Sequence, residues 1–106
     1  MRATTLIDGQ LVALIGRLDV LGAGAAREAL HAAVGAGTGE LVVDLSGVEL
    51  LDAIGLGVLV GTHRRAQLVG RRLVLRDAAP RVARLLMLTR IDRIIALDQT
   101  AAAGVA

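Results

Sequence analysis

The chain has 106 residues, of which 55% are hydrophobic and 21% are charged, and its formal net charge at pH 7 is +2. This length suits one domain with one buried core, and the composition excludes a disordered chain. Cysteine, lysine and all aromatic residues are absent, which excludes disulfide frameworks, thiolate metal sites, thiol nucleophiles and lysine-dependent cofactor chemistry. From these missing residue types we expect no metal or cofactor. No apolar run is long enough to cross a membrane and no secretory leader is visible, so we expect a soluble, cytoplasmic protein.

The first two predicted elements form a hairpin. Short apolar runs at residues 4–7 and 11–16 are separated by Asp8-Gly9. An Asp-Gly pair between two apolar runs favours a tight turn that joins antiparallel strands.

A helix and a buried strand are predicted next. Residues 23–36 read as a helix that ends at Gly35, and its apolar positions fall on one face at the spacing i, i+4, i+7, i+8; they are Ala26, Leu30, Ala33 and Val34. Residues 41–45 form an almost continuous apolar run, which suits a strand buried on both faces. We expect Ser46-Gly47 to turn the chain after this strand.

A second helix is predicted at residues 55–69, with Asp52 just before it as an N-cap. Its residues expected to face the sheet are Leu56, Leu59, Val60 and Ala66. Gly57 and Gly61 lie inside this helix, where each costs about 1 kcal/mol relative to alanine. We expect close packing of the helix backbone against a sheet or a partner to offset that cost.

The last predicted elements are a strand at residues 73–76, a helix at 80–89 and a short strand at 94–97. Proline is favoured in the first turn of a helix, and Pro80 stands at that position. The predicted inner face of this helix consists of Val82, Leu85, Leu86 and Thr89.

The element order is therefore β-β-α-β-α-β-α-β. Strands that alternate with helices imply crossover connections and a mostly parallel sheet, to which the opening hairpin adds an antiparallel strand. We predict a single α/β domain over residues 1–106, with a core at about 5–98 and a tail at 99–106.

The sequence carries no arrangement typical of an enzyme. The two histidines, His31 and His63, fall on different predicted helices, so no histidine pair at metal-binding spacing exists. A nucleophile elbow requires glycine two residues before its serine, and Asp44 occupies that position relative to Ser46. We therefore expect a protein that binds another protein and catalyses no reaction.

Two segments resemble the STAS domain, the family that includes bacterial anti-sigma-factor antagonists. They are residues 41–48 (LVVDLSGV) and residues 51–57 (LDAIGLG). In that family a strand ending in Asp-Leu-Ser is followed by a loop and by Asp-Ser-Ser-Gly-Leu-Gly at a helix start. Further agreement lies at residues 16–20, 70–75 and 80–88, so that the resemblance covers about residues 5–98.

The resemblance implies a function in the control of transcription. In the family, the serine before the glycine is phosphorylated by an anti-sigma factor that is a serine kinase. The unphosphorylated antagonist binds that kinase and frees the sigma factor. By this resemblance the partner-binding surface would consist of Asp52, Ala53, Ile54, Gly55 and Leu56, with Asp19 beside them.

The chain departs from the family pattern at the phosphorylated position. Ile54 stands where the family has its phosphoacceptor serine, and Ala53 replaces the serine before it. A phosphate would add about −1.5 to −2 charges at pH 7 and so block docking, and neither residue can accept one. Two questions stay open at this point: whether Ile54 is a contact or packs inward as a remnant, and whether Ser46 or Thr62 is phosphorylated instead.

Three functions remain to be compared. The first is an anti-sigma-factor antagonist that phosphorylation at position 54 cannot switch. The second is a STAS interaction module in a stress-signalling complex or beside a membrane transporter, where membrane association would come only through a partner. The third, nucleic-acid binding by Arg64, Arg65, Arg71 and Arg72, is disfavoured because the chain lacks aromatic residues for stacking and has a net charge of only +2.

Overall fold

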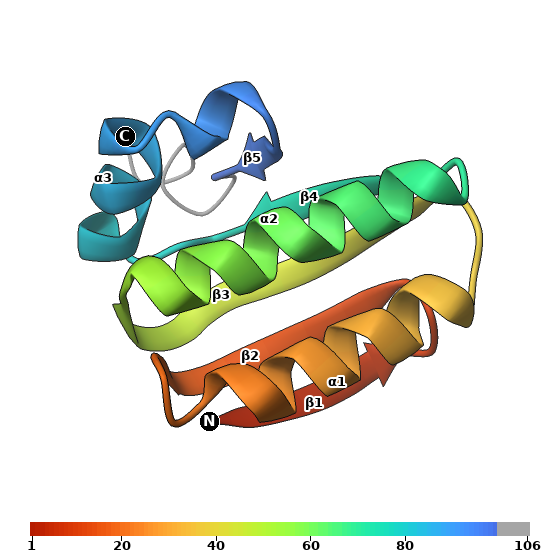
Figure 1. Ribbon diagram of the computed structural model, residues 1–106, viewed down its shortest axis with the longest axis horizontal. Coiled ribbons are helices and arrows are strands. Elements are labelled where there is room, and N and C mark those ends of the chain that lie inside the picture. The colour runs from red at the N-terminus through yellow and green to blue at the C-terminus, as the bar shows by residue number, and fades with distance from the viewer. Residues whose placement is uncertain (100–106) are drawn as a thin grey trace.

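The computed structural model describes residues 1–99 as one five-stranded sheet with helices packed against it (Figure 1). The elements in chain order are β1 (Arg2–Ile7), β2 (Leu11–Leu18), α1 (Ala23–Gly35), β3 (Glu40–Leu51), α2 (Ala53–Leu68), β4 (Arg72–Arg76), α3 (Pro80–Leu88), the 3-10 turn η1 (Ile91–Arg93) and β5 (Ala96–Asp98). The predicted tail at 99–106 lies outside the described residues except for Gln99.

The sheet is mixed, as the alternation of elements predicts. Its strand order is β1-β2-β3-β4-β5. Strands β1 and β2 are antiparallel, whereas the other three pairs of neighbours are parallel. The predicted Asp8-Gly9 turn is present: Gly9 has a φ of +68°, and the Gln10 N–H donates to the Ile7 carbonyl over 2.9 Å. The predicted fold class is confirmed.

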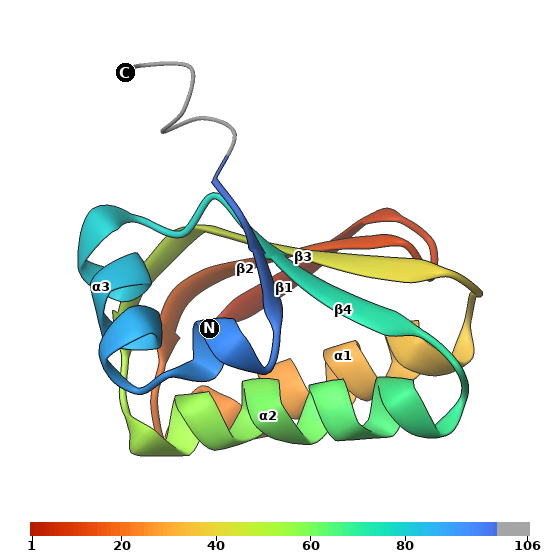
Figure 2. The same cartoon turned by 90° about the horizontal axis from the view of Figure 1, so that it is seen from above.

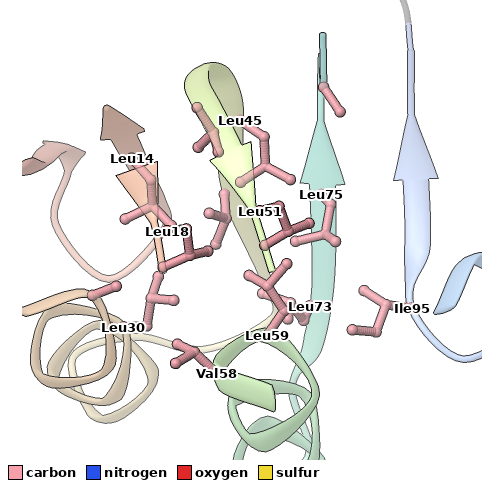
Figure 3. Packing of buried hydrophobic residues seen from close by; sticks show 14 of the residues in the cluster. Leu14, Leu18, Leu30, Leu45, Leu51, Val58, Leu59, Leu73, Leu75 and Ile95 are labelled. Atoms are coloured by element: carbon pink, nitrogen blue, oxygen red, sulfur yellow. The ribbon is translucent and has the colours of Figure 1, made fainter. Parts of the chain in front are cut away.

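Helices α1 and α2 lie side by side on one face of the sheet (Figure 2). Between them and the strands lies a core of leucine, isoleucine, valine and alanine, with no aromatic residue. Figure 3 shows Leu30 of α1 and Val58 and Leu59 of α2 directed toward the leucines of the strands. The predicted inner face of α1 is buried at all four positions: Ala26, Leu30, Ala33 and Val34. No helix among residues 1–99 is long and apolar enough to span a bilayer.

Strand β3 is longer than predicted, and the expected turn at Ser46-Gly47 is wrong. The strand continues from Glu40 to Leu51, and the β2–β3 register shifts between Ala13 and Ile15, opposite this segment. Ser46 is therefore part of an irregularity within a strand. The error arises because Ser-Gly is typical of turns, whereas pairing with β2 keeps this segment extended.

Two other boundaries differ from the predicted ones. Helix α2 begins at Ala53, directly after Asp52, and so includes residues that the sequence suggested were a loop. The last strand is Ala96–Asp98 rather than 94–97, because η1 precedes it and Ile95 is buried in the core as part of a loop. Thr89, predicted to face inward, is exposed after α3, where its hydroxyl donates to the Leu85 carbonyl over 2.8 Å.

The glycines of α2 also differ from expectation. A Cβ added at Gly57 or Gly61 would meet no atom within 4 Å, so neither residue packs against the sheet. Gly55 is the close contact instead, because a Cβ there would lie 2.1 Å from the Leu18 carbonyl oxygen.

Candidate protein-binding site

Two chain segments that are distant in sequence meet at one end of the molecule. The loop between β2 and α1 and the junction between β3 and α2 both lie at the end where the two helices begin (Figure 1). The Asp52 N–H donates to the Leu18 carbonyl over 3.5 Å. Because Gly55 has no side chain, the first turn of α2 rests directly on the end of β2.

Asp52 is the N-cap of α2, as the sequence predicts. Its Oδ1 accepts a hydrogen bond of 2.9 Å from the Gly55 N–H, and its backbone is extended. This bond satisfies one of the donors that a helix start leaves without a partner. The cap fixes the turn that carries Ala53 and Ile54 on the exposed side and Leu56 against the core.

The side chain of Ile54 is directed toward solvent and is 47% exposed. Ile54 is therefore not part of the buried core. Ala53, Gly55 and Leu56 in the same turn are uncharged, and the turn begins at the carboxylate of Asp52.

Asp19 shapes the opposing loop from within. It is 9% exposed, and its Oδ1 accepts hydrogen bonds of 3.1 Å from the N–H groups of Leu21 and Gly22, while the Arg17 guanidinium donates to Oδ2. The Gly22 N–H is the main reason that the pKa of Asp19 lies below its usual value; Arg17 and Leu21 act in the same direction and desolvation opposes them. Asp19 directly follows Leu18, whose carbonyl accepts from the Asp52 N–H, but its side chain offers little surface for contact.

Sequence analysis missed the two residues that this loop exposes. Val20 is 68% exposed and Leu21 is 91% exposed. The sequence does contain a sign of their exposure. Asp19 and Gly22 are residue types typical of turns, and the two large apolar residues stand between them. Val20 and Leu21 lie in the loop before α1, and Ile54 lies in the first turn of α2 at the same end of the molecule (Figure 1); we call these three exposed residues the apolar corner.

The apolar corner contains no hydroxyl group. Thr62 is fully buried, and its hydroxyl donates to the Val58 carbonyl over 2.8 Å. Ser46 is exposed on β3, where its hydroxyl donates to the Asp44 carboxylate over 2.7 Å.

A hollow of about 550 Å³ adjoins the corner and is lined by Met1, Gly16, Arg17, Asp19, Leu21 and Gly22. Nowhere in residues 1–99 do three histidine or acidic side chains gather as a metal site.

Comparison with known families identifies the fold and its family. The family model described as "Mlab, STAS domain" matches residues 4–97. The chain belongs to the STAS family. Its five-stranded mixed sheet and its element order are thus those of a STAS domain.

Solved structures similar to this STAS domain include several anti-sigma factor antagonists. One from Mycobacterium paratuberculosis is 30% identical, with a TM-score of 0.75 over 98% of this chain and 88% of that chain. A Thermotoga maritima protein described as a candidate anti-sigma factor antagonist is 25% identical, with a TM-score of 0.76 over 95% and 88% of the two chains. The anti-sigma factor antagonist SpoIIAA in its unphosphorylated form is 18% identical, with a TM-score of 0.73 over 96% and 90%, a likeness of fold.

Proposed function

We propose that this STAS domain is an anti-sigma-factor antagonist that binds a serine-kinase anti-sigma factor through the apolar corner. The observation that carries the proposal is the exposure of Ile54 at the start of α2, at the same end of the molecule as the exposed Val20 and Leu21. The family membership and the similarity to an antagonist from Mycobacterium paratuberculosis support the kind of partner. The protein acts by binding, without catalysis.

The physical advantage of the corner is apolar area that a partner can bury. Burial of a whole isoleucine side chain contributes about 1.5–3 kcal/mol, and 47% of Ile54 is still available for burial. We therefore assign about 1 kcal/mol to this side chain. Val20 and Leu21, which are more exposed, add to the same contact.

The corner has lost the phosphorylation switch. SpoIIAA exists in a phosphorylated and an unphosphorylated form. Here Ala53 and Ile54 carry no hydroxyl, and the hydroxyl of Thr62 is buried within α2. The proposed antagonist therefore cannot be switched off by phosphorylation at position 54.

The first test changes the charge of the corner. Ile54→Asp places a carboxylate in the proposed interface, and we expect binding to an anti-sigma kinase to weaken by about a hundredfold or more. Ile54→Val keeps a branched apolar side chain and should change the affinity by less than about threefold. Binding by isothermal titration calorimetry to a panel of anti-sigma kinases measures both, and unaltered binding of Ile54→Asp would show that the corner is not the interface.

A second test restores a serine at position 54 and asks whether the chain can then be phosphorylated. Ile54→Ser restores a hydroxyl at the phosphoacceptor position, and the cognate kinase should then incorporate phosphate and release the variant. Ala53→Ser is the matched control and should remain unphosphorylated. Phosphate incorporation is followed by mass spectrometry; phosphate on the unchanged chain under the same conditions would contradict the proposal.

The absence of a hydroxyl group at Ala53 and Ile54 also favours a second function. A STAS module that serves as a permanent scaffold in a stress-signalling complex, or beside a membrane transporter, needs no phosphate to release it. Capture of stress-complex or transporter proteins by the unchanged chain, lost in Ile54→Asp, would select this function over the first.

A further inference from the structure

The segment from α3 through η1 concentrates positive charge that the fold leaves unpaired. Between residues 80 and 95 stand four arginines and one acidic residue, Asp92, a net charge of +3. All four arginines are exposed, and they are Arg81, Arg84, Arg90 and Arg93. None of them belongs to a salt bridge among residues 1–99, whereas Arg76 at the sheet pairs with Asp44. This charge is therefore free to attract an anionic partner.

Large apolar side chains are exposed on the same segment. Met87 is 54% exposed, Leu88 is 73% exposed and Ile94 is 54% exposed. Helix α3 packs its other side into the core, through Val82, Ala83 and Leu86. Because residues three, four and seven apart share one side of a helix, Arg81, Arg84 and Leu88 lie outward together. The outward side of α3 thus combines arginines with apolar side chains.

The exposed residues of 81–94 lie at one corner of the molecule, which we call the basic corner. Figure 1 shows α3 and the turn after it on the far side of α2 from α1. The hollow of about 550 Å³ at the apolar corner and a second hollow of about 480 Å³ are both lined by other segments. Neither hollow gives the basic corner a groove for an extended peptide, whereas a flat bilayer surface needs no groove.

We propose that the basic corner binds the surface of a bilayer that contains anionic phospholipids. An arginine guanidinium can donate two parallel hydrogen bonds to one phosphate group, and an anionic leaflet attracts basic residues near its surface. Met87, Leu88 and Ile94 enter the boundary between headgroups and acyl chains, where their exposed area leaves water. A standard protein interface takes about 20–30 residues on each side. One short helix and one turn expose fewer, so the basic corner suits lipid better than an acidic protein.

The contact with the bilayer is direct, weak and reversible. It differs from the association through a partner that the STAS resemblance suggested. The chain has no aromatic residue to anchor it at the membrane interface, and only three apolar side chains are inserted. The arginines therefore supply most of the attraction, and binding should fall steeply as salt screens them. No anti-sigma factor takes part, so this contact is independent of the proposed function.

The experiment is co-sedimentation of the chain with vesicles of phosphatidylcholine alone and with vesicles of phosphatidylcholine and phosphatidylglycerol in equal parts. The chain should bind the anionic vesicles at about 50 mM salt and be released at about 500 mM. Arg81→Glu combined with Arg84→Glu should weaken binding by about tenfold or more. Arg64→Glu combined with Arg65→Glu is the matched control, because it makes the same change in net charge at exposed residues of α2. It should bind within about threefold of the unchanged chain.

The apolar side chains are tested separately. Leu88→Ser should weaken binding to the anionic vesicles by about threefold or more, whereas Leu68→Ser should leave it unchanged. The two leucines are a matched pair, because each is the last residue of its helix and they are 73% and 86% exposed. Circular dichroism of every variant checks that it is folded.

Three results would overturn the membrane contact. They are the absence of binding to the anionic vesicles, equal binding to both kinds of vesicle, and equal losses in the two arginine double variants. Retention of the chain on polyglutamate without binding to vesicles would also overturn it, and would assign the basic corner to an acidic protein.

Discussion

At the scale of single residues, Arg71 connects segments that are distant in the sequence. It is 5% exposed, and its guanidinium donates only to backbone carbonyls. These carbonyls belong to the hairpin turn, the end of α1 and the segment that enters β3: Gly9, Ala33, Val34, Thr38, Gly39 and Glu40. Arg71 thus joins three parts of the chain through hydrogen bonds to their backbone carbonyls.

We expect Arg71→Ala to lower the free energy of unfolding by about 3 kcal/mol or more, because several buried carbonyls lose their donor at once. Arg72→Ala is the matched control. The side chain of Arg72 is 68% exposed and pairs with Glu40 at the surface over 3.2 Å, so its loss should cost less than about 1 kcal/mol. Urea unfolding followed by circular dichroism measures both variants; equal midpoints would refute the role of Arg71.

The sequence predicts the structural role of some single residues and not of others. Asp52 was identified as an N-cap because its signal is local: a capping residue directly before an apolar helical pattern. Arg71 and Asp19 were not recognised as buried, since arginine and aspartate are mostly exposed. Their burial depends on carbonyl and N–H groups that the fold supplies, and in the case of Arg71 these come from up to 62 residues away.

At the scale of elements, the contact between α2 and the end of β2 sets the geometry of the apolar corner. Gly55 and Gly57 lie two residues apart on the same helix and face opposite environments. A Cβ on Gly55 would lie 2.1 Å from the Leu18 oxygen, whereas one on Gly57 would meet nothing.

Gly55→Ala should therefore destabilise the fold by about 2 kcal/mol, because the first turn of α2 must move away from β2. Gly57→Ala should stabilise it by up to about 1 kcal/mol, the difference in helix propensity. Thermal unfolding followed by circular dichroism measures both. A destabilised Gly57→Ala, or a Gly55→Ala as stable as the unchanged chain, would contradict this reading of the junction.

Elements with a local signal were predicted well, and those that depend on a distant strand were not. The hairpin, α1 and the start of α3 follow from Asp8-Gly9, apolar periodicity and Pro80. The second half of β3 has no such signal: it stays extended because β2, about 30 residues earlier in the chain, pairs with it as far as Leu18 and Leu51. The exposure of Val20 and Leu21 likewise follows from how Asp19 folds its loop.

At the scale of the whole molecule, three titratable groups among residues 1–99 link stability to pH. The pKa of Asp44 is below its usual value: desolvation would raise it, but hydrogen bonds from the Ser46 hydroxyl and N–H and from Arg76 outweigh that effect. The pKa of Asp19 is also lowered, chiefly by the Gly22 N–H. The pKa of His31 is lowered by desolvation and by Arg65 and Arg27. In each case the unfolded chain binds protons more readily than the folded one.

Stability should therefore fall as the solution is made acidic, in two stages. His31 contributes an early decline below its ordinary value of about pH 6.5, and the two aspartates contribute a second one below about pH 4, their ordinary value. Asp44→Asn should lower the urea midpoint at pH 7 and reduce the second decline, since its carboxylate contributes only while it is ionised. Asp92→Asn, at an exposed residue outside the core, is the control and should follow the unchanged chain. Urea midpoints measured from pH 7 to pH 2.5 test this; a midpoint that rises between pH 4 and pH 2.5 would show that these carboxylates are not stabilised by folding.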